Sequence, residues 1–291
     1  MPLFGAHMSI AGGYYKALEA AHALGMEACQ LFTKNNNQWR AKPITDEEVK
    51  LFRDTQKATG IEYTIAHASY LINLASASKP LFRQSVDAMV EEMRRAALLG
   101  LDALVVHPGA AVHASEEDAL ARIVIAVDEI LDRSPKNHVR LLLETTAGQG
   151  TCLGHRFEHL AEILASVKQS KRVGVCLDTC HVFAAGYALS PARSYRATLR
   201  QFDRVIGLER VQAFHLNDSR KPLNSRVDRH AHIGQGHLGL EAFRLLVHDR
   251  RFRKMPMLLE TPKESEDCDT WDAINLATLR GLVSKRSRAS A

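Results

Sequence analysis

The sequence lacks the features that mark several large classes of protein. Charged residues interrupt every apolar segment, so no run reaches the roughly 18 to 20 residues that span a bilayer, and no membrane partner is expected. The N-terminal residues lack the basic start and long apolar core of a signal peptide, which predicts a cytoplasmic protein. The five cysteines include no Cys-x-x-Cys pair, which argues against a zinc finger and against a disulfide framework.

The sequence also lacks an internal boundary. No linker or shift in composition divides the 291 residues, so a single domain is predicted over residues 1–283, followed by a frayed basic tail at 284–291. The formal net charge of +5 at pH 7 permits a polyanionic partner without requiring one.

Short apolar segments alternate with helical patterns along the whole chain. The predicted strands cover residues 3–6, 28–32, 63–66, 102–106, 139–143, 173–178, 211–214 and 257–259. A helical segment after each strand indicates a parallel sheet with right-handed crossovers. Eight such units predict an α/β protein with a single closed (β/α)₈ TIM barrel, and a doubly wound open sheet is the alternative.

Six of these strands end in a side chain that can bind a metal ion: His67, His107, Glu144, Asp178, His215 and Glu260. Each could instead cap the helix that follows. Histidine is a poor N-cap, however, and burying a carboxylate at a strand end without a compensating cation costs several kcal/mol. In a barrel all six ends meet at the C-terminal rim, so the sequence predicts a metal site there.

Two loops add three more candidate ligands, His181, Asp228 and His230. Alternatively the histidines are ordinary surface residues, and Asp228 pairs with Arg226 or Arg229. Because one zinc ion takes three or four protein ligands, nine candidates indicate two or three ions. The mixture of imidazole and carboxylate favours zinc or manganese over magnesium. Clustered ions of this kind can activate water for attack on a phosphodiester.

Polar loops near the predicted rim suit a nucleic acid. The segment 34–40 contains Lys34, Asn35 and Asn37 and is rich in amides that can bind phosphate oxygens and minor-groove acceptors. The Tyr70-Leu71 step is either core packing or an apolar wedge of the kind that unstacks bases. Arg229 belongs to a basic loop that is otherwise explained as a solvated surface.

At this point the sequence resembles the endonuclease IV family of apurinic/apyrimidinic endonucleases over nearly its whole length. The stretches that carry the resemblance are 5–7 with 12–13, 32–35, 69–74, 107–109, 144–150, 178–181, 215–218, 228–230 and 259–262. Several of them are long, which makes a chance match improbable.

The resemblance implies a zinc-dependent DNA repair hydrolase that cleaves duplex DNA on the 5′ side of an abasic site. It implies three zinc ions, with manganese an alternative at one position, and Glu144 and Glu260 as catalytic carboxylates. The implied ligand sets are His67, His107 and Glu144; Glu144, Asp178, His215 and Glu260; and His181, Asp228 and His230. The implied DNA contacts include Tyr70 and Leu71, which match the pair that fills the gap left by the flipped nucleotide.

Two residues depart from the family pattern. Asn37 stands where members often have an arginine, and Ala68 stands where an acidic residue often follows the histidine of the third strand. The residue at position 37 is expected to affect the insertion of a side chain into the DNA stack, and the residue at position 68 is expected to affect the support of His67. A monomer is expected, since it leaves the DNA face free. The rival functions are a xylose-isomerase-like sugar isomerase or epimerase with one divalent ion, and a non-catalytic DNA-binding barrel.

Overall fold

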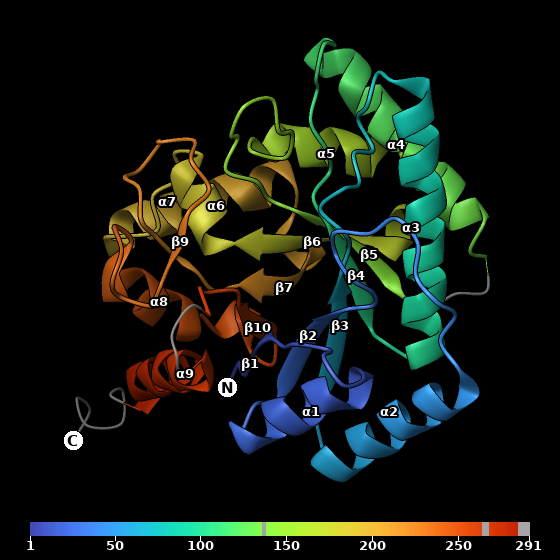
Figure 1. Cartoon of the computed structure of the whole chain (residues 1–291). Helices are drawn as coiled ribbons and strands as arrows, with labels where there is room; N and C mark the ends of the chain where they lie inside the picture. Colours follow the sequence, from blue (N-terminus) through green and yellow to red (C-terminus); the bar gives the residue numbers. More distant parts are fainter. Residues whose placement is uncertain (136–137, 264–267, 285–291) are drawn as a thin grey trace.

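The computed structural model describes residues 1–135, 138–263 and 268–284. Its centre is a closed barrel of parallel strands (Figure 1). The barrel strands are β1 (Leu3–His7), β2 (Ala28–Phe32), β3 (Tyr63–His67), β4 (Ala103–Val106), β5 (Arg140–Glu144), β6 (Val173–Asp178), β7 (Val211–His215) and β10 (Pro256–Leu259). Their order is β1-β10-β7-β6-β5-β4-β3-β2, and β1 pairs with both β10 and β2. The predicted (β/α)₈ barrel is therefore confirmed, and the open sheet is excluded.

The helices surround this barrel (Figure 1). They are α1 (Tyr14–Ala23), α2 (Asp46–Thr59), α3 (Lys79–Leu99), α4 (Glu116–Asp132), α5 (Phe157–Ser166), α6 (Thr179–Ala184), α7 (Ala192–Val205), α8 (Gly239–Val247) and α9 (Cys268–Ser284). Among the described residues, none of these helices has both the length and the apolar character needed to cross a membrane. The predicted tail falls on Ser284, which ends α9, and on residues 285–291, which lie outside the described residues.

Local signals set the limits of several helices. Thr45 and Glu48 form a reciprocal capping box at the start of α2, and Gly60 ends the helix in the left-handed conformation with φ of 70°. The sequence pattern predicts a helix over residues 81–99. The helix α3 begins two residues earlier, at Lys79, because Pro80 fits the first turn, where no intrahelical N–H bond is lost. The sequence did not predict α6 or the short antiparallel pair β8 (Asp218–Ser219) and β9 (His230–Ala231).

Two apolar clusters hold the barrel together. A larger cluster fills the space between strands and helices and includes fully buried phenylalanines such as Phe52, Phe157 and Phe214. A smaller one fills the lumen and consists of Ala28, Ile65, Ala103, Val105, Leu142, Cys176, Ala213 and Leu258. Since side chains alternate along a strand, the residue two places after each of these lumen positions also points inward. That alternation builds the rim described next.

Candidate metal centre

A layer of polar side chains closes the C-terminal end of the lumen. Each barrel strand, or the residue directly after it, contributes one member, and the eight members are His7, Gln30, His67, His107, Glu144, Asp178, His215 and Glu260. Six of them are the predicted ligands at strand ends. These side chains point into the lumen because an apolar lumen residue lies two positions earlier, for example Ile65 before His67 and Leu142 before Glu144.

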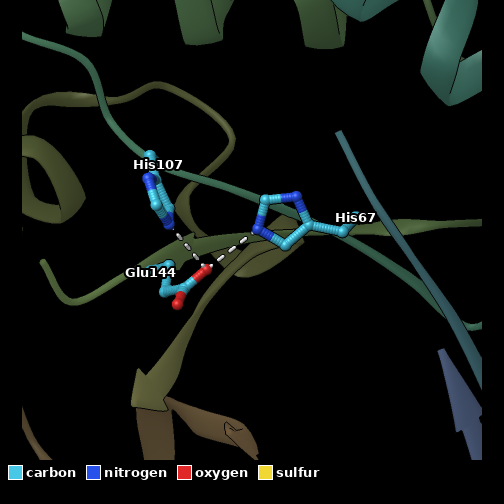
Figure 2. Close-up of side chains that lie close together, drawn as sticks. All are labelled: His67, His107 and Glu144. Atoms are coloured by element: carbon cyan, nitrogen blue, oxygen red, sulfur yellow. Dashed lines mark hydrogen bonds and ion pairs between the residues drawn. The ribbon is translucent and has the colours of Figure 1, made fainter. Parts of the chain in front are cut away.

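Glu144 lies at the middle of this layer and is fully buried. Its Oε2 is 3.1 Å from His67 Nε2 and 3.2 Å from His107 Nε2, and both imidazoles point at the carboxylate (Figure 2). Its Oε1 faces away from them, 3.0 Å from His215 Nδ1 and 3.2 Å from His181 Nδ1. The two oxygens of Glu144 therefore face two different groups of residues.

The second group contains Glu144, Asp178, His215 and Glu260, whose potential ligand atoms all lie within 4.8 Å of one another. His215 Nδ1 is 3.2 Å from Glu260 Oε2. Asp178 also caps α6, since its Oδ1 accepts a hydrogen bond from the His181 amide at 2.8 Å. Asp178 is therefore both a helix cap and a member of the centre. Its other oxygen, Oδ2, faces inward and accepts a hydrogen bond from Asn217 Nδ2 at 2.6 Å.

The third group assembles around Asp228. Its Oδ2 is 3.0 Å from His181 Nε2 and its Oδ1 is 3.3 Å from His230 Nε2. His230 Nε2 is also 3.8 Å from Asp178 Oδ2, which links this group to the second. Among the described residues, the carboxylate of Asp228 pairs with these imidazoles and not with Arg226 or Arg229; Arg229 donates instead to the backbone carbonyl of Asp228 at 2.5 Å.

Backbone carbonyls orient three of the histidines. The Nδ1 atoms of His67, His181 and His230 bond the carbonyl oxygens of Ala68, Thr145 and Glu260 at 2.7, 2.8 and 3.0 Å. With the proton on Nδ1, the lone pair of each Nε2 faces the carboxylates, as in a metal-binding histidine. Because the backbone of Ala68 supports His67, the loss of an acidic side chain at position 68 leaves this orientation intact.

The residues present fit divalent cations. The Nε2 atoms of His181 and His230 are buried without a hydrogen bond in the described part of the chain. Burial lowers the pKa of His181, but Asp178 and Asp228 outweigh it and hold this pKa well above its ordinary value. Burial raises the pKa of Glu144, but the charges of His215 and His107 outweigh it and hold this pKa well below its usual range. Such a cluster of buried carboxylates and imidazoles binds either protons or metal ions.

Four polar residues that sequence reasoning did not assign support the centre. Thr145 Oγ1 accepts from the Asp178 amide at 3.0 Å, and Asn217 Oδ1 accepts from the Glu260 amide at 2.9 Å. Both lie in stretches that carry the family resemblance, so a signal was present. Gln30 and His7 complete the rim, and the signal for Gln30 was a lone amide inside an apolar strand.

The predicted DNA contacts divide into two classes. Asn35, Asn37 and Arg229 are exposed, Tyr70 is 58% exposed and Leu71 is half-buried, so all five can meet a ligand at the rim. Lys34 lines the same cavity as Tyr70 but is largely buried, so its role as a direct DNA contact stays a prediction. Its side chain is only 2% exposed because Nζ lies 3.0 Å from Glu92 Oε1 and donates to the carbonyl of Gln38 at 2.8 Å.

Two cavities border the centre. One of about 750 Å³ is lined by Glu260, Phe32, Tyr70 and the asparagines at 35–37. The other, of about 250 Å³, is lined by His67, His107, Tyr70 and Leu71. A further cavity of about 540 Å³ contains none of the predicted ligands and is lined by Arg220, Ala231, His232, Gln235, Gly236 and His237. Ser69 Oγ donates to the Asn36 carbonyl at 2.5 Å, which joins the loops after β2 and β3 along the first cavity.

Comparison with known proteins identifies the family. The model of the xylose isomerase-like TIM barrel family matches residues 18–281. A probable endonuclease 4 from Chloroflexus aurantiacus is 50% identical over 97% of this chain and 99% of its own length. The crystal structure of endonuclease IV from Thermus thermophilus superposes with a TM-score of 0.86, at 39% identity, over 98% of this chain and all of that one. A D-tagatose 3-epimerase-like protein, at 18% identity and a TM-score of 0.72 over 97% of this chain and 99% of its own, shares the fold alone. The chain therefore belongs to the endonuclease IV family.

Proposed function

We propose that this protein is a metal-dependent DNA repair endonuclease. It hydrolyses the phosphodiester bond on the 5′ side of an abasic site in duplex DNA and leaves a 3′-hydroxyl and a 5′-deoxyribose phosphate. The observation that carries the proposal is Glu144, whose two oxygens face two separate groups of ligand residues. One shared carboxylate supports adjacent ions rather than the single ion of a sugar isomerase or epimerase.

Zinc is the proposed metal, with three ions per chain and manganese an alternative at one position. His67, His107 and Glu144 would hold the first ion, and Glu144, Asp178, His215 and Glu260 the second. His181, Asp228 and His230 would hold the third. Ions held there would lower the pKa of a water molecule and neutralise the charge that develops on a departing oxygen.

The protein residues supply the geometry of the reaction. Glu144 and Glu260 are the proposed catalytic carboxylates. Each has one oxygen that faces His215 Nδ1, so the two carboxylates lie near each other in the second group. Full burial of Glu144 and Asp178 places their charges in surroundings of low dielectric, where interactions with cations and with a phosphate at the rim are strong.

The rim also fits DNA. Exposed Tyr70 borders the larger cavity and could fill the stack beside a flipped nucleotide, next to half-buried Leu71. The amides of Asn35 and Asn37 line the same cavity. Arg229 and the cavity lined by Arg220 offer cationic and imidazole donors to backbone phosphates, which such groups bind independently of sequence.

The test is incubation of the zinc-loaded protein with a duplex that carries one abasic analogue. We expect a single cut 5′ to the lesion, abolished in Glu260→Gln and retained in Glu47→Gln, an exposed carboxylate on α2. Metal analysis should find about three ions per chain.

Other outcomes would overturn the proposal. About one ion per chain without cleavage would favour the isomerase or epimerase. Tight binding of abasic duplex without cleavage, with the ions in place, would favour a non-catalytic DNA-binding protein.

A further inference from the structure

Gln30 is a buried amide at the centre of the barrel rim. It lies in the middle of β2 between apolar neighbours, is fully buried, and points into the lumen two residues after Ala28. It stands directly opposite His7 in the pairing of β2 with β1. Burying an amide at this point costs free energy unless its donors and acceptor are all satisfied.

Gln30 makes three hydrogen bonds, which use both of its N–H donors and its oxygen. Its Oε1 accepts from His215 Nε2 at 2.8 Å, and its Nε2 donates to Glu260 Oε1 and to His7 Nδ1, the latter at 2.9 Å. Because a carboxylate accepts but does not donate, the NH₂ end of the amide faces Glu260 and the oxygen faces His215. The proton of His215 is therefore placed on Nε2, and its Nδ1 lone pair faces Glu144 and Glu260.

The Glu260 carboxylate sets the orientation of the amide, and His7 Nδ1 lies at its second N–H. If the amide turned over, its oxygen would meet the Glu260 carboxylate, which cannot donate a hydrogen bond. The His7 ring is itself packed against Phe32, with the ring centroids 4.2 Å apart. The orientation of the amide is thus set by Glu260, with the packed His7 ring beside it.

We infer that Gln30 is a positioning residue that prepares His215 and Glu260 to bind one particular metal ion. The inference rests on the proposed metal centre. His215 differs here from His67, His181 and His230, whose protons are directed by backbone carbonyls that no side-chain substitution removes. Loss of the Gln30 amide should consequently affect the ion held by Glu144, Asp178, His215 and Glu260 and spare the other two.

The test compares Gln30→Met with the wild-type protein. Methionine keeps the length of the side chain and removes its hydrogen bonds. Competition with a chromophoric chelator should show zinc affinity 10- to 100-fold weaker at one site of about three, the usual effect of losing a group that orients a metal ligand. The matched control is Gln56→Met, a half-buried glutamine on α2 that makes two hydrogen bonds away from the centre.

A second measurement reports the orientation itself. Nitrogen-15 shifts of the His215 ring should show the Nε2–H form in the wild type and a mixture of forms in Gln30→Met, while the His181 ring stays unchanged in both. We also expect kcat to fall with little change in KM, because DNA does not contact Gln30.

Equal weakening of all sites, no weakening, or an Nδ1–H form of His215 in the zinc-loaded wild type would overturn the inference; the last outcome is measurable without any variant. If the wild type binds three ions and cleaves abasic DNA while Gln30→Met behaves identically, this inference alone fails. If the wild type itself neither binds three ions nor cleaves, the proposed function fails as well.

Discussion

Replacing Lys34 by methionine tests whether this lysine supports its loop or contacts DNA. Its ammonium is buried against Glu92 on α3, and the other oxygen of Glu92 accepts from the Thr33 hydroxyl. Methionine preserves the length of the side chain but leaves the Glu92 charge buried without a cation. Removing one partner of a buried ion pair costs about 3–5 kcal/mol, so the free energy of unfolding should fall by that amount.

The assay is urea denaturation of the wild type, Lys34→Met and the double variant Lys34→Met/Glu92→Met. The double variant should recover most of the loss, since it leaves no unpaired charge. The control is Lys50→Met, which breaks the exposed ion pair with Asp54 and should change stability far less, because solvent screens that pair.

Binding of abasic duplex at several salt concentrations completes the test. If Lys34 only supports the loop, affinity falls by a factor that is independent of salt. A direct phosphate contact would instead lower the slope of log K against log salt by about 0.9. Unchanged stability together with that smaller slope would refute the structural role of Lys34.

Further predictions concern the centre and the DNA face. Chelation should lower the thermal midpoint, and zinc at 100 times its Kd should restore about 2.7 kcal/mol per site, measured by calorimetry. In the metal-free protein burial lowers the pKa of His230, but Asp228 and Asp178 raise it to about 9. The stabilisation by protonated His230 is therefore complete below pH 6.5 and is lost as pH rises through 9. Urea denaturation should show that the free energy of unfolding falls less over this pH range in His230→Asn than in the wild type. Tyr70→Ala should weaken binding of abasic duplex by about 1–3 kcal/mol, measured by fluorescence anisotropy, with unchanged stability. Arg229→Gln should lower the salt slope of that binding by about 1, and an unchanged slope would contradict a phosphate contact.

Local patterns predicted most of the barrel. The capping-box pattern that starts at Thr45 and the glycine at position 60 predict the limits of α2 from the sequence, and both act within one turn of the chain. The inward direction of His67 and Asp178 followed from the alternation of side chains along a strand. The short helix α6 was missed because its six residues are too few to show a helical period.

The roles of Lys34 and Gln30 could not be predicted in the same way. A lysine in a polar loop is ordinarily exposed, and only the approach of α3 brings Glu92 to it. Gln30 and Glu260 are 230 positions apart and meet because β1 pairs with β2 on one side and β10 on the other.

The sequence by itself determined the chemistry of the rim, because strand ends and side-chain alternation depend on neighbours a few residues apart. It determined that imidazoles and carboxylates end six strands of a parallel barrel. The tertiary structure alone decided which oxygen of Glu144 faces which histidine, which histidine depends on a side chain for its orientation, and which cation is buried. Those contacts depend on the closure of the barrel and on helix packing, which bring together groups that no local pattern relates.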